Sequence, residues 1–279
     1  MNIIESEQAA EIIKKIIAGG ASNLHLLADF DRTLTYGTLN GVRTPSVIAL
    51  LRDGKHLTPD YAVKAHALFD KYHAYEVDDS LSKEERKAYM QEWWDVHNQL
   101  LIDSGLSLKD YEDIVQSGKI KFREGIVGFL NLLHEKKVPL VIISAAACGD
   151  AIKMYFKQMN CDFDNINYIV NRYQWGANGQ AIATVKPTIT VANKDEIMLG
   201  GFPNIFEKIK DRKNVILLGD GLDDPGMVEG FAYENLLKIG FLNPGFDSPQ
   251  EAFQAAYDVV LEGDGDVAYL NKLLQQIAE

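Results

Sequence analysis

The sequence has little cysteine, no long apolar run and a shortage of positive charge. Its two cysteines, Cys148 and Cys161, do not have the CxxC spacing of a zinc ribbon or a redox pair, so neither of these sites nor a disulfide framework is indicated. No apolar stretch reaches the roughly 18 residues of a membrane-spanning helix. The N-terminus carries an early acid, Glu5, where a secretory signal would be apolar. We therefore expect a cytoplasmic protein.

The charge balance is strongly acidic, with 28 lysines and arginines against 40 aspartates and glutamates and a formal net charge of −12. Such a chain repels the phosphate backbone of nucleic acid, and the sequence has no basic stripe that would attract it. The surplus of carboxylates fits a divalent-cation site, or simply solubility. We expect a monomer that acts on a small molecule, with neither nucleic acid nor a membrane as a partner.

Apolar segments typical of strands alternate with helical segments, first near the N-terminus and again from residue 125 onward. A helix is expected over residues 6–18 and a buried strand over residues 24–28. Later strands are expected at residues 140–143, 168–171, 215–218, 237–241 and 258–261. The pair Asn178-Gly179 predicts a hairpin over residues 173–184, outside this alternation. The pattern predicts an α/β fold with a doubly wound, mostly parallel sheet.

The stretch that follows the first strand is helical and poor in strands. Helices are expected over residues 61–72, 82–104 and 107–116. Ser82 with Glu85, and Ser107 with Asp110, have the spacing of a capping box. We therefore expect a core of residues 1–45 and 123–279 and an inserted helical cap of residues 46–122. Because the insertion leaves just after a strand, it should lie over the carboxyl ends of the sheet.

Two carboxylates follow the first expected strand directly. Asp29 and Asp31 are two residues apart, so in an extended segment their side chains point the same way. One carboxylate can attack phosphorus while the other handles the proton of the leaving oxygen. Alone, this pattern, which ends in Thr33, also fits two solvated turn acids with a threonine cap.

Two further strand ends carry groups suited to phosphate and a cation. Ser144 and Ala145 follow the second expected strand, where a hydroxyl and free amides can bind phosphate oxygens or merely cap the next helix. Asp220 and Asp224 follow the fourth expected strand, where carboxylates can complete a Mg²⁺ site or occupy a helix N-terminus. Lys194 precedes that strand and can neutralise phosphoryl charge, although most lysines are solvated.

Taken together, these residues resemble the four motifs of the haloacid dehalogenase-like hydrolases. The resemblance implies that Asp29 is the nucleophile of an aspartyl-phosphate mechanism and that Asp31 is the acid/base. It also implies a Mg²⁺ site made of Asp29, the main-chain carbonyl of Asp31, and Asp220. Supporting roles go to Thr33 and Asp224. The positions that would bind phosphate are Ser144, Ala145 and Lys194.

Longer stretches resemble the type III cytosolic pyrimidine 5′-nucleotidases and span most of the chain. They are residues 75–78, 89–94, 122–125, 193–194, 215–220 and 238–243. The resemblance implies a Mg²⁺-dependent phosphohydrolase of nucleoside 5′-monophosphates, of the pyrimidine or 7-methylguanosine type, with a helical cap that recognises the base. Glu76 matches the glutamate with which that family contacts the base.

Three more residues of the expected cap are candidates for contacting the base. Trp93 and Trp94 offer aromatic faces for stacking, but with Met90 they also have the spacing of a packed helix face. His97 stands where the family usually has a serine that contacts the nucleotide, and it fits a packing role equally well. The choice of base is therefore left open.

Two other functions fit the same residues. The first is a phosphatase or phosphotransferase of the same superfamily that acts on another small phosphate ester. The second is a catalytically silent binding protein that keeps the fold. The presence of Asp29, Asp31 and Lys194 favours an enzyme over this second alternative.

Overall fold

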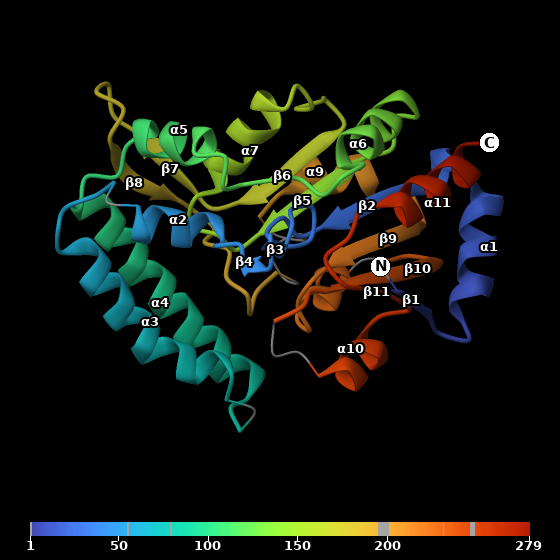
Figure 1. Cartoon of the computed structure of the whole chain (residues 1–279), viewed down its shortest axis with the longest axis horizontal. Coiled ribbons are helices and arrows are strands. Elements are labelled where there is room, and N and C mark those ends of the chain that lie inside the picture. The colour runs from blue at the N-terminus through green and yellow to red at the C-terminus, as the bar shows by residue number, and fades with distance from the viewer. Residues whose placement is uncertain (1, 55, 79, 195–200, 231, 246–248) are drawn as a thin grey trace.

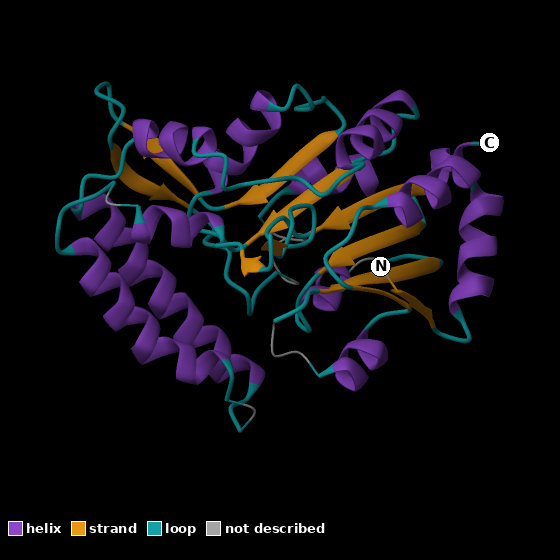
Figure 2. Cartoon of the chain, in the orientation of Figure 1, coloured by secondary structure: helices purple, strands orange, loops and turns teal. Residues whose placement is uncertain are grey.

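The computed structural model describes residues 2–54, 56–78, 80–194, 201–230, 232–245 and 249–279 (Figures 1 and 2). In chain order the first elements are β1 (Asn2–Glu5), α1 (Ala9–Gly19), β2 (Leu24–Ala28), β3 (Thr38–Leu39), β4 (Val42–Arg43), α2 (Val47–Asp53), α3 (Tyr61–Glu76), α4 (Lys83–Asp103) and α5 (Leu108–Gln116). They are followed by α6 (Ile126–Glu135), β5 (Leu140–Ser144), α7 (Gly149–Gln158), β6 (Ile166–Val170), β7 (Arg172–Trp175) and β8 (Ala181–Val185). The last are α9 (Pro203–Ile209), β9 (Asn214–Gly219), β10 (Asn235–Leu242), α10 (Gln250–Ala256), β11 (Val259–Glu262) and α11 (Ala268–Ala278). Among these described helices, none combines the length and apolarity needed to cross a bilayer.

The described strands include a central sheet of seven, in the order β1-β11-β10-β9-β2-β5-β6. Its neighbouring strands are parallel, except that β1 runs antiparallel to β11. This confirms the mostly parallel α/β sheet expected from the sequence. The strand β1 was not expected, and it extends the sheet at the edge formed by β11.

Alternate residues of the central strands pack into two hydrophobic cores, one on each face of the sheet. Leu26 and Ile142 belong to the core that includes residues of α1, α6, α7 and α11. Leu27 and Val141 belong to the other core, which includes residues of α9 and α10. Because successive side chains of a strand point to opposite faces, a strand covered on both faces needs a continuous apolar run, which is what the sequence has here.

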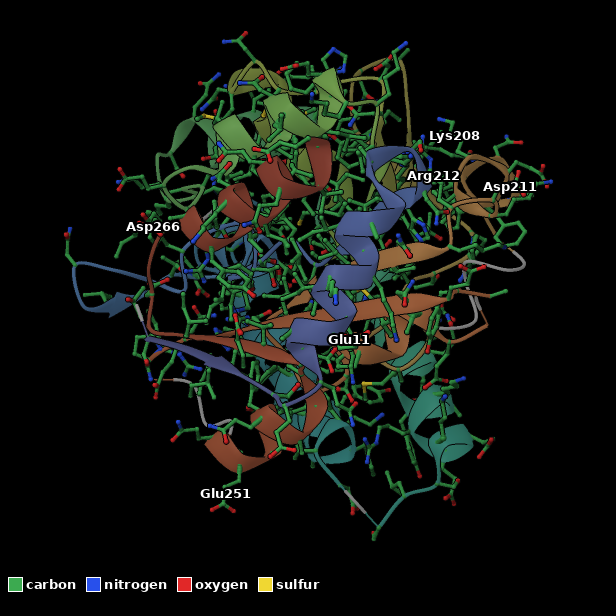
Figure 3. All side chains as sticks on the ribbon, turned by 90° about the vertical axis from the view of Figure 1, so that its right-hand side faces the viewer. Glu11, Lys208, Asp211, Arg212, Glu251 and Asp266 are labelled. Carbon is green, nitrogen blue, oxygen red and sulfur yellow. The ribbon has the colours of Figure 1, made fainter. Side chains whose placement is uncertain are left out.

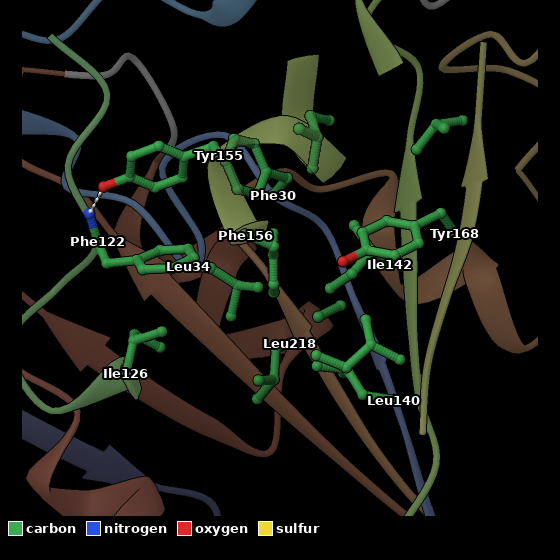
Figure 4. Packing of buried hydrophobic residues seen from close by; sticks show 14 of the residues in the cluster. Phe30, Leu34, Phe122, Ile126, Leu140, Ile142, Tyr155, Phe156, Tyr168 and Leu218 are labelled. Atoms are coloured by element: carbon green, nitrogen blue, oxygen red, sulfur yellow. Dashed lines mark hydrogen bonds between the residues drawn. The ribbon is translucent and has the colours of Figure 1, made fainter. Parts of the chain in front are cut away.

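The first core continues up to the carboxyl end of β2. Phe30 is the second residue after β2 and is fully buried. Its ring packs edge to face against Phe122 and Tyr155, and Tyr155 also accepts a hydrogen bond from the main-chain N–H of Phe122 (Figure 4). The chain is therefore held in the core at the position between Asp29 and Asp31.

Helices α2 to α5 form an insertion between β2 and α6, and α3 and α4 pack side by side as a long helical pair (Figure 1). The capping box at the start of α4 is confirmed. The Glu85 N–H donates to Ser82 Oγ at 3.2 Å, and the Ser82 N–H donates to the Glu85 carboxylate at 3.0 Å. The helix expected at residues 61–72 continues one turn further, to Glu76.

The expected hairpin around Asn178-Gly179 is confirmed as the antiparallel pair β7–β8. Its turn lies against the insertion, since the Leu108 N–H donates to the Gly179 carbonyl at 3.0 Å and the Ala181 N–H donates to the Leu106 carbonyl at 2.8 Å. The hairpin therefore shares main-chain hydrogen bonds with the base of the helical insertion.

Candidate active site

Three neighbouring strands bring the expected site residues to one edge of the sheet. β2 lies between β9 and β5, and its last residue, Ala28, is level with Leu218 of β9 and Ile142 of β5. Asp29 follows β2, Asp220 follows β9, and Ser144 ends β5. The carboxyl ends of parallel strands are where open α/β sheets bind their ligands. The structure therefore brings together three motifs that lie far apart in the sequence.

Asp29, Asp220 and Asp224 form a cluster of carboxylates at this edge. Each offers an oxygen atom, and these three atoms lie within 4.8 Å of one another. Burial, together with the negative charges of Asp29 and Asp224, raises the pKa of Asp220 well above its usual value. Burial likewise raises the pKa of Asp29. The cluster is a place where negative charge is crowded and a positive charge is favoured.

Lys194 supplies one such positive charge. Its Nζ lies 2.9 Å from Asp29 Oδ1 and 2.7 Å from Asp224 Oδ1. Burial alone would lower the pKa of Lys194, but the two carboxylates raise it above its usual value, so the side chain stays charged. An ammonium group has three donors. Among the described residues, the two carboxylates use two of them, and the third can reach another acceptor.

Both carboxylate oxygens of Asp224 accept hydrogen bonds from neighbouring groups. Its Oδ1 accepts from Lys194, and its Oδ2 accepts the main-chain N–H groups of Asp220 and Gly221 at 3.0 and 2.9 Å. Within the part of the chain that the structure describes, the Asp220 carboxylate has a 3.4 Å contact with the Thr33 hydroxyl and a 3.9 Å contact with Arg32. Carboxylate oxygens are the ligands that Mg²⁺ prefers. The donor set therefore fits Mg²⁺, and the side chains that could hold it are Asp220 and Asp29, although one oxygen of Asp29 also accepts from Lys194.

Asp31 points toward the insertion. Its carboxylate accepts the main-chain N–H of Val47, the first residue of α2, at 3.3 and 3.4 Å. Burial raises the pKa of Asp31 to about 6, against the opposing effects of Arg32 and of the Val47 amide. A carboxyl group with such a pKa can both give and take a proton near neutral pH.

The loop after β5 is held from two sides. The carbonyl of Ala145 accepts a hydrogen bond from Trp94 Nε1 at 2.8 Å and one from Asn171 Nδ2 at 3.0 Å. Asn171 also exchanges two hydrogen bonds of 2.8 Å with the main chain of Ile189. The Ser144 hydroxyl accepts the N–H of Ala146 at 3.2 Å. The sequence interpretation gave no role to Asn171, whose one signal was its place as a polar residue at the end of an expected strand.

A cavity of about 340 Å³ opens beside Lys194, between the insertion and the core. Its walls come from the α3–α4 end of the insertion and from the segments before and after β9. The lining residues are Leu81, Lys83, Arg86, Val191, Ala192, Lys194, Asp223, Gly226 and Glu229. The two sides are joined by an ion pair of 2.8 Å between Lys83 and Glu229. The volume suits a small-molecule ligand.

The four residues expected to contact the base are not among the described residues that line this cavity. Glu76 accepts a hydrogen bond of 2.8 Å from His73 Nδ1. Trp93 is 7% exposed and stacks on Tyr72, with its indole N–H unpaired among the described residues. Trp94 reaches the loop after β5. The structure therefore brings Trp94 to the loop after β5, whereas Trp93 belongs to a cluster of the insertion against which Val191 and Ala192, two of the cavity-lining residues, pack.

His97 packs inside the insertion as well. Its Nε2 lies 2.9 Å from the Tyr61 hydroxyl, and the two rings are stacked. Burial lowers the pKa of His97 to about 4. The imidazole is therefore neutral at physiological pH.

Known proteins match this chain along nearly its whole length. The family model described as pyrimidine 5′-nucleotidase (UMPH-1) matches residues 32–278. A 7-methylguanosine phosphate-specific 5′-nucleotidase of Gallus gallus is 31% identical over 278 residues, which cover 99% of this chain and 96% of that protein. The Homo sapiens protein of the same name is 31% identical over 268 residues, covering 96% of this chain and 89% of that protein.

Solved structures show the same fold. A crystal structure of cytosolic 5′-nucleotidase IIIB bound to cytidine aligns with a TM-score of 0.88 at 24% identity, over 99% of this chain and 93% of that chain. A substrate-bound phosphoserine phosphatase aligns with a TM-score of 0.52 at 17% identity, over 89% of this chain and 96% of that chain. The fold expected from the sequence is thereby confirmed.

Proposed function

The chain belongs to the pyrimidine 5′-nucleotidase (UMPH-1) family, and from this premise we propose that it hydrolyses nucleoside 5′-monophosphates with Mg²⁺ through an aspartyl-phosphate intermediate. The resemblance noted in the sequence is thus confirmed, and the relatives are named as 5′-nucleotidases. The chain is a phosphoric monoester hydrolase. The observation that carries the proposed mechanism is the ion-paired set of Asp29, Lys194 and Asp224 beside the cavity.

In the first half of the proposed reaction, Asp29 attacks phosphorus in line with the leaving 5′-oxygen. The bond from phosphorus to that oxygen breaks, and Asp31 gives the oxygen its proton, so that a nucleoside leaves and Asp29 carries the phosphoryl group. The raised pKa of Asp31 supports this role, because a protonated carboxyl group is then present near neutral pH. The third N–H of Lys194 is proposed to hold an equatorial phosphate oxygen.

In the second half, water attacks the acyl phosphate. Asp31, now a carboxylate, takes a proton from that water, and the products are inorganic phosphate and the original Asp29 carboxylate. Ser144 and the main chain at Ala145 are proposed to hold the phosphate oxygens through both halves. Asp224 is proposed to keep Lys194 in place, and Thr33 to support Asp220.

Asp29, Asp220 and the main-chain carbonyl of Asp31 are proposed to hold the metal ion. When bound, Mg²⁺ would neutralise the charge of the phosphate and so let a carboxylate approach it. The crowding of Asp29, Asp220 and Asp224 within 4.8 Å supports this assignment.

The substrate is proposed to be a pyrimidine or 7-methylguanosine monophosphate. Relatives of this chain are named for 7-methylguanosine phosphate, and the similar solved structure contains cytidine. We propose that residues 46–122 act as a cap over a core of residues 1–45 and 123–279, and that Glu76, Trp93, Trp94 and His97 help to recognise the base. A relative named putative cytosolic 5′-nucleotidase 3 supports a cytoplasmic location.

The test is phosphate release by the purified chain from a panel of nucleoside 5′-monophosphates, including 7-methylguanosine monophosphate, and from para-nitrophenyl phosphate. We expect release that requires Mg²⁺, stops with a chelator, and is fastest for one class of base. If no nucleotide in the panel is hydrolysed in the presence of Mg²⁺, the proposed function is wrong. Faster release from a different phosphate ester would favour the alternative of another phosphatase of the superfamily.

A further inference from the structure

Arg123 is a fully buried arginine just before α6, in one of the stretches that carry the family resemblance but to which no role has been given. Its side chain is 0% exposed. Burial lowers the pKa of its guanidinium, and the neighbouring Asp264 opposes that effect. A buried charge is costly unless its hydrogen bonds are made. The hydrogen-bond partners of Arg123 therefore indicate the role of its buried guanidinium.

All five N–H donors of Arg123 have acceptors. Nε donates to the main-chain carbonyl of Thr33 at 2.9 Å, and Nη2 donates to the carbonyl of Arg32 at 2.6 Å. The other acceptors are Asn243 Oδ1 at 2.6 Å, Asp264 Oδ1 at 2.8 Å and the carbonyl of Gly265 at 3.1 Å. An arginine has five such donors in a rigid plane. The group is therefore saturated, and two of its bonds go to the main chain just after Asp31.

Asn243 and Asp264 hold the same segment of chain from the ends of β10 and β11. Asn243 Nδ2 donates to the Arg32 carbonyl at 3.1 Å. The Asp264 carboxylate accepts the N–H of Gly37 at 3.0 Å and also binds Thr38. A Cβ on Gly37 would lie 2.7 Å from Asn243 Cγ, so the segment lies closely against these groups.

Arg32 and Thr33, whose carbonyls Arg123 binds, link the proposed reacting residues Asp29 and Asp31 to Asp220, the proposed metal ligand. Arg32 has a φ of 64°, a left-handed conformation that is costly for a residue with a side chain. The hydroxyl of the next residue, Thr33, donates to Asp220 at 3.4 Å. The main chain therefore turns sharply between Asp31 and a contact of Asp220, and the Arg123 guanidinium binds both carbonyls of that turn.

We infer that Arg123 is a positioning residue, which fixes the main chain just after Asp31 and so sets the direction of the two reacting aspartates. Asn243 and Asp264 act with it. The inference rests on the proposed function, because it is the proposed chemistry that needs Asp29 and Asp31 to be directed. Groups that orient metal ligands and reacting groups from behind commonly affect activity or metal affinity by about 10–100-fold.

The chain offers a matched control. Arg212 donates to three main-chain carbonyls, those of Ala21, Leu24 and Lys137, at 2.9, 2.9 and 3.0 Å. Leu24 is the first residue of β2, so Arg212 ties down the opposite end of the strand that leads to Asp29. Figure 3 labels it on the face that carries α1, at the far side of the molecule from α3 and α4 in Figure 1.

The experiment compares Arg123→Lys, Arg123→Met, Asn243→Ala and the control Arg212→Lys with the unchanged chain. For each protein, kcat and KM for para-nitrophenyl phosphate are measured at a temperature where circular dichroism shows it folded. A second readout does not need turnover. The melting temperature is measured as Mg²⁺ is added in the presence of fluoroberyllate, which mimics a phosphoryl group on a carboxylate. The Mg²⁺ midpoint is the concentration that gives half of the total rise in melting temperature.

We expect Arg123→Met to lower kcat by about 100-fold with little change in KM, and Arg123→Lys and Asn243→Ala to lower it by about tenfold. The Mg²⁺ midpoint should rise about tenfold in the same variants. Arg212→Lys should lower the melting temperature but leave kcat and the Mg²⁺ midpoint within about twofold. If Arg123→Met does not fold, the lysine variant and Asn243→Ala decide the question.

The inference is overturned if Arg123→Lys and Asn243→Ala keep both readouts within about twofold of the unchanged chain. It is also overturned if Arg212→Lys loses as much kcat as they do, because Arg123 would then be merely structural. Failure of the unchanged chain to release phosphate would instead contradict the proposed function. The Mg²⁺ midpoints would still decide the role of Arg123 in that case.

Discussion

The indole N–H of Trp94, in α4 of the insertion, donates a 2.8 Å hydrogen bond to the carbonyl oxygen of Ala145, in the loop after β5. The same carbonyl accepts from Asn171 of the core. The loop proposed to bind phosphate is therefore held by the insertion and the core together. Movement of the insertion would change one of the two supports of that loop.

Trp94→Phe is expected to lower kcat/KM about fivefold, because it removes a hydrogen bond worth about 1 kcal/mol while keeping an aromatic ring. Steady-state kinetics with para-nitrophenyl phosphate would measure the change. Trp175→Phe is the control, since the Trp175 indole donates to Asp150 at 3.2 Å on α7. Equal losses in the two variants would show that the contact with Ala145 has no particular effect on catalysis.

Asp29→Asn is expected to abolish turnover while the protein stays folded, because an amide is a poor nucleophile. Phosphate release and circular dichroism would be measured side by side, and intact-mass spectra would be searched for a phosphorylated chain. Asp211→Asn, an exposed acid that is not among the described residues lining the cavity, should keep full activity. Undiminished hydrolysis by Asp29→Asn would rule out the proposed intermediate.

Asp220→Asn is expected to make the metal-free protein more stable and to abolish its stabilisation by Mg²⁺. Burial and two nearby carboxylates raise the pKa of Asp220, so a carboxyl group at this position destabilises the metal-free fold at neutral pH. Relief of about 1 kcal/mol should raise the melting temperature by about 2–4 °C. Thermal melts with Mg²⁺ and with a chelator test this, and a Mg²⁺-dependent rise that persists in the variant would exclude Asp220 as a ligand.

Glu76→Ala is expected to change the preference among nucleobases more than it slows hydrolysis of para-nitrophenyl phosphate, which has no base. The measurement is kcat/KM over the nucleotide panel. His73→Gln, which removes the 2.8 Å partner of Glu76, shows whether that contact orients the carboxylate. Equal losses on every substrate would reject Glu76 as a selector.

His25 should make the protein less stable in mild acid. It is 2% exposed in β2, and burial lowers its pKa to about 4, below the roughly 6.5 of an unfolded chain. Between these values the unfolded chain binds the extra proton, so stability is lost as the pH falls. Relative to His25→Gln, the free energy of unfolding should drop by about 2 kcal/mol from pH 7.5 to pH 5. Urea titrations of the unchanged chain and of His25→Gln at each pH would measure the free energy of unfolding. The same dependence on pH in both proteins would contradict the prediction.

The central strands could be predicted because their signal is local. β2 has the expected bounds, Leu24–Ala28, and all five of its residues are buried. β5 and β9 are likewise buried along their whole length, and apolar runs at residues 140–143 and 215–218 mark them in the sequence. The site follows from these strands, because a polar residue at the end of such a run must lie at the edge of the sheet.

Features that depend on distant partners could not be predicted. β1 is mostly exposed and exists because it pairs with β11 near the other end of the chain. No pattern in the nearby sequence predicts the contacts of Asn171 or the five acceptors of Arg123. The same holds for His97, whose partner Tyr61 lies on another helix. Such contacts are set by tertiary packing, which a pattern of residue types does not encode.

Because the turn of the β7–β8 hairpin is hydrogen-bonded to the chain at Leu106 and Leu108, the helices cannot be transplanted by themselves. A graft of residues 46–122 onto a related scaffold would leave main-chain groups at its root without their partners, at a cost to folding. Exchange of the proposed cap between relatives would therefore require residues 46–122 and the β7–β8 hairpin to move together. A graft that carries the hairpin with the helices should keep both of these main-chain hydrogen bonds.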